Sequence, residues 1–157
     1  MKLSTKGRYG LRAVLDLALN AKGEVVPLSE IAIRQNISIS YLEQLISKLR
    51  RAGIVTSIRG AQGGYQLARD PKTLSVGEIL RTLEGNLDPV NCSEITGEGD
   101  GCSSSDNCVT KHVWKRISDS ISSAVDTLML SELIEESNKV NPGTHDEEEL
   151  IEKPICR

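Results

Sequence analysis

The sequence contains no phenylalanine, and its only aromatic residues are Trp114 and three tyrosines. A core built from this chain must therefore be mostly aliphatic. The chain has no run of about eighteen apolar residues, and its opening stretch MKLSTKGRYG lacks the apolar region of a secretory signal peptide. We therefore expect a cytoplasmic protein that does not associate with a membrane.

Motifs of common enzyme classes are also missing. The sequence has no P-loop, and it contains no recognisable Ser/His/Asp set. The glycine-rich stretch GAQGG at residues 60–64 lies in a predicted hairpin rather than between a strand and a helix, so it is not a nucleotide-binding fingerprint. We predict that the protein is not an enzyme.

Charge is divided unevenly along the chain. Residues 1–70 hold 11 Lys and Arg against 5 Asp and Glu, a net charge of +6. Residues 71–157 hold 8 against 17, a net charge of -9. This asymmetry indicates that the first half meets a polyanion, the alternative being an ordinary solvated surface.

At 157 residues with 38% apolar content, the chain can bury one ordinary core with a small appended element. Apolar residues recur at helical spacing in residues 5–21, 27–35 and 39–53. A hairpin is predicted from a β-branched stretch, the GAQGG turn and residues 65–67. Another helix is predicted at residues 75–85. The sequence therefore predicts a mainly α-helical fold, a winged helix-turn-helix with a small β-hairpin wing, followed by a long C-terminal helix.

The third helix is the expected recognition helix, which enters the major groove of DNA. Gln44 can make paired hydrogen bonds to adenine, and serine hydroxyls can serve several bases. Glu43 either accepts a hydrogen bond from cytosine or completes a capping box with Ser40, with Ser38 as the alternative cap. The DNA contacts predicted on this helix are Ser38, Ser40, Tyr41, Glu43, Gln44 and Arg50.

Further DNA contacts are predicted on the first helix and on the wing. Lys6 and Arg8 fall in the first turn of a helix, where positive charge opposes the helix dipole. An external anion would relieve that cost; we expect a DNA phosphate, with simple solvation as the alternative. Arg59 and Gly60 lie beside the wing tip, which lies along the DNA backbone or minor groove in a winged helix.

A long helix with one apolar face is predicted from Thr110 onwards. The residues of that face are Val113, Ile117, Ile121, Ala124, Val125 and Leu128. The face either packs against the N-terminal domain of its own chain or pairs with a second copy. We predict the pairing, because a homodimer would place two recognition helices about one DNA turn apart, as a pseudo-palindromic operator in double-stranded DNA requires.

Three of the four cysteines lie between positions 92 and 108, in a segment rich in Gly, Ser and Asp that has no helical or strand period. The spacing C-x9-C-x5-C-x3-H fits neither a zinc ribbon nor a thioredoxin motif. A cluster of two irons tolerates wider spacing, because its ligands surround a larger object than one ion. The alternatives are a structural zinc site in a winged-helix adapter that binds protein, and a disulfide switch without metal.

Several stretches resemble the IscR-type family of winged-helix transcription factors: MKLSTKGRYGLRA, VPLSEIA, ISISYLEQLISKLRRAGIV, SIRGAQGGYQLARD, VGEI, and the cysteine segment followed by VTKHVW. The resemblance covers nearly all of residues 1–134. It implies a homodimeric regulator with a [2Fe-2S] cluster in each subunit, whose occupancy alters promoter choice and controls cluster-biogenesis genes. A nitric-oxide-sensing repressor of the same architecture is the alternative.

The cluster ligands that the resemblance implies are Cys92, Cys102, Cys108 and His112. The family pattern is C-x5-C-x5-C-x2-H, so the first gap is four residues longer here, and Lys111 stands at the family's histidine position. Along a helix, one residue turns a side chain by about 100°. His112 can still ligate if the helix begins later; otherwise Asp106, Cys156 or the other subunit supplies the fourth ligand.

The chain is thereby predicted to have four parts. They are a winged-helix DNA-binding domain in residues 1–84, a cysteine-rich cluster-binding loop in 85–109, a dimerisation helix and a short helix in 110–137, and an acidic mobile tail in 138–157.

Overall fold

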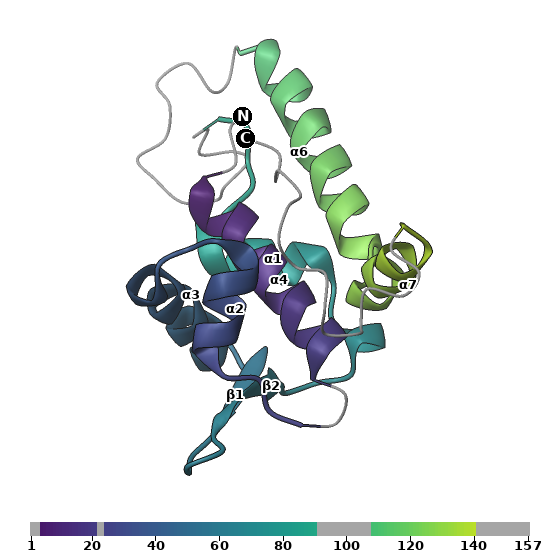
Figure 1. The fold of residues 1–157 in the computed structure, drawn as a ribbon. Helices are drawn as coiled ribbons and strands as arrows, with labels where there is room; N and C mark the ends of the chain where they lie inside the picture. The colour runs from purple at the N-terminus through teal and green to yellow at the C-terminus, as the bar shows by residue number, and fades with distance from the viewer. Residues whose placement is uncertain (1–3, 22–23, 91–107, 141–157) are drawn as a thin grey trace.

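The computed structural model describes residues 4–21, 24–90 and 108–140. In chain order, its elements are α1 (Thr5–Asn20), α2 (Leu28–Gln35), α3 (Ile39–Arg51), β1 (Val55–Ile58), β2 (Gly64–Leu67), the 3₁₀ helix η1 (Pro71–Thr73), α4 (Val76–Glu84), α6 (Thr110–Thr127) and α7 (Leu130–Val140). Helices α1 and α4 lie at the centre, with α2 and α3 on one side (Figure 1). Helix α6 rises away from this bundle, and the β1–β2 hairpin extends from the opposite end.

The core is aliphatic, as the composition predicts. Its largest fully buried side chains include Leu17, Ile31, Leu42, Leu45, Ile46, Leu49, Ile79, Leu83 and Leu130. On α3 the buried residues recur every three or four positions, which places them on one face of the helix. The opposite face of α3 is consequently exposed to solvent.

Local features of the sequence explain where α3 begins and where it ends. The predicted capping box of Ser40 and Glu43 is wrong, because Ser40 already lies inside the helix. Ser38 is the N-cap instead, and its Oγ accepts a hydrogen bond from the backbone N–H of Tyr41 at 3.3 Å. Beyond the other end, the chain turns at Gly53, whose φ of 71° favours glycine. The helix thus ends at Arg51, two residues before the predicted bound of 53.

The hairpin is the predicted wing. Strands β1 and β2 are antiparallel, with Val55 opposite Leu67 and Ile58 opposite Gly64. Two backbone hydrogen bonds between Tyr65 and Val26, of 2.8 and 2.9 Å, anchor the hairpin to the segment between α1 and α2. Gly64 permits this approach, because a Cβ there would lie 2.6 Å from the carbonyl oxygen of Val26.

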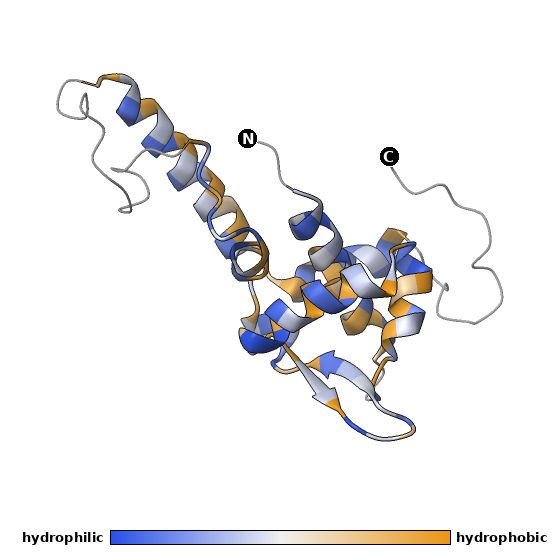
Figure 2. Cartoon of the chain, turned by 90° about the vertical axis from the view of Figure 1, so that its left-hand side faces the viewer, coloured by the Kyte–Doolittle hydropathy of each residue, from blue (hydrophilic) through white to orange (hydrophobic). Residues whose placement is uncertain are grey.

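The apolar face of α6 divides into two halves with different surroundings. Near the end of the helix, Ile121 and Val125 pack against Val76 and Leu80 of α4. The exposed apolar residues near its start are Val109 (80% exposed), Val113 (52%) and Ile117 (37%). Figure 2 shows this end of α6 extending beyond the bundle. The end of the face thus packs within its own chain, while pairing of the start with a second copy stays a prediction.

Helix α7 returns to the core of the N-terminal domain. Leu130 is fully buried there, and its backbone N–H donates to the carbonyl of Leu74 at 2.9 Å. The sequence placed the end of this helix at residue 137, but α7 continues to Val140. An ion pair between Glu136 and Lys139 lies in this last turn. Residues 141–157, most of the predicted tail, lie outside the described ranges.

None of the helices in the described ranges combines the length and apolar content needed to cross a membrane.

Candidate functional site

The outer face of α3 carries a shallow hollow lined by Ser40, Glu43, Gln44, Ser47, Lys48 and Arg51. Three of these residues, Ser40, Glu43 and Gln44, are predicted DNA contacts. Arg50 is exposed but does not line the hollow. Lys48 and Arg51 do line it, and helical spacing from Gln44 already places them on the same face. The hollow therefore combines hydrogen-bonding groups with two cations, which suits contact with base edges and phosphates.

Tyr41 is held by contacts within the chain. Its ring meets that of Tyr9 edge-on, with centroids 6.1 Å apart, and its hydroxyl donates to Oγ1 of Thr5 at 3.1 Å. The guanidinium of Arg12 lies over the ring of Tyr9, with its Cζ 5.5 Å from the ring centroid. Unlike the exposed residues of the hollow, Tyr41 is half-buried and joins the start of α3 to α1.

The first turn of α1 already has an anionic partner within the chain. Oε1 of Glu84, the last residue of α4, accepts hydrogen bonds from the backbone N–H groups of Ser4 (3.1 Å) and Gly7 (2.8 Å). The carboxylate already offsets the helix dipole from within the chain, so the dipole is no longer a reason to expect a DNA phosphate here. Contact of Lys6 and Arg8 with DNA stays a prediction. Lys6 and Arg8 are exposed, so both side chains remain free to meet DNA.

The wing tip presents its predicted residues to solvent. Arg59 and Gly60 are both exposed, and Gly60 has a φ of 140°, which favours glycine. The carbonyl of Gly60 accepts from the backbone N–H of Gly63 at 3.0 Å, which closes the turn. The tip can therefore place the guanidinium of Arg59 against a DNA backbone.

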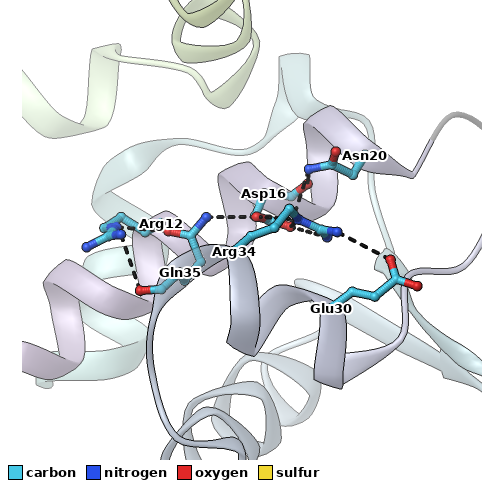
Figure 3. Close-up of polar contacts among 6 residues, drawn as sticks. All are labelled: Arg12, Asp16, Asn20, Glu30, Arg34 and Gln35. Carbon is cyan, nitrogen blue, oxygen red and sulfur yellow. Dashed lines mark hydrogen bonds and ion pairs between the residues drawn. The ribbon is translucent and has the colours of Figure 1, made fainter. Parts of the chain in front are cut away.

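A buried carboxylate on α1 orients α2, the helix that precedes the predicted recognition helix α3. Asp16 is 4% exposed and accepts from Nη2 of Arg34 at 2.7 Å and from Nε2 of Gln35 at 2.7 Å (Figure 3). The side-chain oxygen of Gln35 in turn accepts from Nε of Arg12 at 2.9 Å. The hydrogen bond to Asp16 raises the pKa of Arg34. This network fixes α2 against α1 through paired and satisfied charges.

Polar contacts also join α6 to α4. Arg81 forms an ion pair with Asp126 through both carboxylate oxygens, and this hydrogen bonding lowers the pKa of Asp126 and raises that of Arg81. Ser118, the buried polar residue of α6, donates to Oδ1 of Asp88. The helix that follows the cysteine segment is thus attached to the helix that packs against α1 and α3.

Cys108 lies two residues before the start of α6 and is the one predicted cysteine ligand within the described ranges. A hydrogen bond with Oγ1 of Thr110, at 3.2 Å, and one from the backbone N–H of Lys111 lower the pKa of its thiol. The thiolate, which is the form that binds metal, is therefore more readily formed than in an ordinary cysteine. Cys92 and Cys102 lie in the segment that is not described, and the described part of the chain shows no group of three or more His, Cys, Asp or Glu suited to a metal.

His112 lies in the first turn of α6 and is exposed. The helix begins at Thr110. The later start that would have moved His112 toward the family's ligand position is therefore not observed. Asp106 and Cys156, the alternatives in the sequence, fall outside the described ranges.

Comparison with known proteins places this arrangement in a family. The profile of the Rrf2 family, described as an iron-dependent transcriptional regulator, matches residues 3–136. The HTH-type transcriptional regulator IscR of Escherichia coli is 42% identical over 134 residues, which cover 85% of this chain and 80% of that protein.

Two solved structures are similar along most of their length. T. potens IscR is 42% identical, with a TM-score of 0.73 and coverage of 90% of this chain and 91% of that one. CymR (YrzC), the global cysteine regulator of B. subtilis, is 38% identical, with a TM-score of 0.71 and coverage of 87% and 98%. The chain therefore belongs to the Rrf2 family of transcriptional regulators.

Proposed function

We propose that the protein is a homodimeric, DNA-binding regulator that senses iron-sulfur cluster status through a [2Fe-2S] cluster and controls cluster-biogenesis genes. The observation that carries the DNA-binding part is the hollow on α3, where Ser40, Glu43 and Gln44 lie beside Lys48 and Arg51. Amide, hydroxyl and carboxylate groups can read base edges, while the cations bind phosphates. Lys6, Arg8 and Arg59 extend this cationic surface to α1 and the wing tip.

The donor set of the cysteine segment fits an iron-sulfur cluster in its chemistry. Cys108 is held where its thiolate is favoured, and Cys92 and Cys102 supply two more sulfur ligands of the same kind. The fourth ligand is proposed to be His112, with Asp106, Cys156 or a group from the second subunit as alternatives. Such a cluster, when bound, supplies a centre that is sensitive to redox state and oxygen.

The proposed dimer uses the exposed start of α6. Val109, Val113 and Ile117 present apolar surface that nothing else in the described part of the chain covers. Because the other end of α6 is attached to α4 by the Arg81–Asp126 pair, pairing of two α6 helices would fix the separation of two winged-helix domains.

The proposed function predicts that loss of the cysteine ligands changes DNA binding. Binding to promoter fragments of cluster-biogenesis genes should be measured without oxygen for the wild type and for Cys92→Ala/Cys102→Ala/Cys108→Ala. We expect the two proteins to differ in affinity or in promoter preference. Cys156→Ala, measured beside the triple variant, removes the cysteine outside the predicted segment. It should bind as the wild type does if His112 is the fourth ligand, and should change binding if Cys156 is. Identical binding by wild type and triple variant would contradict cluster sensing, while leaving DNA binding itself intact.

A thiol-redox or nitric-oxide-sensing regulator of the same architecture is the second candidate. The similarity to CymR, named a global cysteine regulator, favours a role for sulfur chemistry without requiring a cluster. The lowered pKa of Cys108 also makes its thiol more easily oxidised. Disulfide mapping after mild oxidation of the metal-free protein tests thiol sensing. DNA binding measured in the presence of nitric oxide tests nitric-oxide sensing. A zinc-stabilised adapter would instead hold one zinc per chain and no iron.

A further inference from the structure

One carboxylate oxygen joins the end of α4 to the start of α1. Oε1 of Glu84 accepts from the backbone N–H of Ser4 at 3.1 Å, from the hydroxyl of Ser4 at 2.7 Å and from the backbone N–H of Gly7 at 2.8 Å. Ser4 is itself the N-cap of α1, and its Oγ accepts from the backbone N–H of Lys6 at 3.0 Å. The carboxylate thus satisfies donors that the first turn of a helix otherwise leaves to solvent.

Close packing fixes this contact in place. A Cβ at Gly7 would lie 2.5 Å from Oε1 of Glu84, and a Cβ at Gly10 would overlap the side chain of Leu83. Two glycines on one face of α1 therefore let the end of α4 approach the helix directly. Nζ of Lys48 lies 3.5 Å from the carbonyl oxygen of Leu83, so α3 meets the same end of α4.

The residues held by Glu84 are neighbours of two candidate DNA contacts. Gly7 lies between Lys6 and Arg8, whose side chains are both exposed. Two cations in the first turn oppose the dipole of α1, and the carboxylate of Glu84 offsets that cost from within the chain. Without this carboxylate, the first turn of α1 would lose the hydrogen bonds that hold its backbone in place. This is the turn that carries the side chains of Lys6 and Arg8.

We propose that Glu84 is a positioning residue for DNA binding, which holds the first turn of α1 so that Lys6 and Arg8 meet the DNA backbone. This rests on the proposed DNA-binding function and adds a residue that faces the protein rather than the DNA. Glu84 contributes through hydrogen bonds to the turn, since its own negative charge would repel phosphate.

The salt dependence of DNA binding tests the proposal, because its slope reports how many phosphates the protein neutralises. Fluorescence anisotropy with a mixed-sequence DNA duplex is measured over a series of salt concentrations for the full-length wild type, Glu84→Ala and Lys6→Ala/Arg8→Ala. We expect Glu84→Ala to lower the slope by about one to two, as the double variant does. The affinity of the wild type for DNA should fall between about 50 and 200 mM salt. Each lost phosphate contact makes that fall about threefold smaller.

The combined variant Lys6→Ala/Arg8→Ala/Glu84→Ala separates positioning from a general effect on stability. If Glu84 acts through the two cations, its loss adds nothing to the slope change of the double variant. Glu84→Gln keeps an oxygen that can accept the same hydrogen bonds, so we expect it to retain most of the wild-type slope. The matched control Glu78→Ala removes an equal charge from the same helix, where the side chain meets Arg69 rather than α1, and should bind as the wild type does.

A Glu84→Ala slope equal to or steeper than that of the wild type would overturn the proposal; a steeper slope would mean that a phosphate takes the vacated position at the helix start. Equal loss of slope in Glu84→Gln and Glu84→Ala, or in Glu78→Ala and Glu84→Ala, would also overturn it. Wild-type protein that binds no duplex at any salt concentration would instead refute the proposed DNA-binding function. Thermal unfolding followed by circular dichroism confirms that each variant is folded at the temperature of measurement.

Discussion

Arg81 of α4 and Asp126 of α6 form a two-pronged ion pair, with Nη2 of the arginine 3.0 Å from Oδ2 of the aspartate. The pair spans 45 positions in the sequence and joins the helix after the cysteine segment to the winged-helix domain. Both side chains are more than one-third exposed, so water and salt weaken the interaction. The pair consequently orients α6 more than it stabilises the fold.

The Arg81–Asp126 pair should make a small, pH-dependent contribution to stability. Asp126→Asn is expected to lower the free energy of unfolding by about 0.2–1 kcal/mol at neutral pH. Because the hydrogen bonds of Arg81 lower the pKa of Asp126 in the folded state, this contribution is complete above the ordinary carboxylate pKa of about 4 and is lost as the pH falls through the lowered value. Urea unfolding of wild type and variant should therefore show a smaller difference at pH 3 than at pH 7.

Loss of the buried carboxylate of Asp16 should destabilise the protein much more. Asp16→Ala leaves the guanidinium of Arg34 without its main partner, which for a buried pair costs about 3–5 kcal/mol. We expect a value near 3 kcal/mol, because the side chain of Arg34 is 19% exposed and keeps its ion pair with Glu30. Urea unfolding measures the loss. Glu30→Ala, which removes the exposed partner of the same arginine, is the control, and an equal loss in both variants would contradict this account.

Base contacts and phosphate contacts should respond differently to substitution. Gln44→Ala is expected to cost about 1–3 kcal/mol of binding free energy at one base position, because the paired hydrogen bonds to adenine are lost. Lys6→Ala should weaken binding to every sequence alike. Titration of an operator and of single-base variants, at constant salt, distinguishes these patterns. Equal losses on all sequences for both variants would show that Gln44 does not read a base.

The exposed start of α6 should control the oligomeric state. Val113→Glu places a charge on the apolar surface proposed for the dimer, and sedimentation velocity should show a shift toward monomer. The fold should be retained, because this side chain is already 52% exposed within its own chain. Ile33→Glu, at a side chain of α2 that is 79% exposed, is the control and should leave the oligomeric state unchanged. A wild-type protein that is monomeric at all concentrations would contradict the proposed dimer.

Local patterns in the sequence predicted the helices and the wing well. Apolar residues at helical spacing in residues 39–53 predicted α3, which ends at Arg51, just before the turn at Gly53. The residues buried on its inner face are Leu42, Leu45, Ile46 and Leu49. The N-cap was ambiguous, because Ser38 and Ser40 both precede a possible first turn and only the backbone geometry distinguishes them.

Contacts between distant positions were not predictable in this way. Glu84 lies 80 positions from Ser4, and no periodicity connects the two residues. The apolar face of α6 is continuous in the sequence, yet Val125 packs against α4 while Val113 is exposed. Helical spacing identifies an apolar face, but the arrangement of neighbouring elements decides what covers it. The placement of Cys92 and Cys102 stays a prediction, since both lie outside the described ranges.

The cysteine segment is proposed to hold an iron-sulfur cluster, and the visible absorption spectrum and iron content of protein purified without oxygen report whether it does. We expect a brown protein with two irons per chain, whose absorption disappears in air and is absent from Cys92→Ala/Cys102→Ala/Cys108→Ala. A spectrum altered by His112→Ala would support this residue as the fourth ligand. A colourless anaerobic protein without iron would show that the segment holds no iron-sulfur cluster.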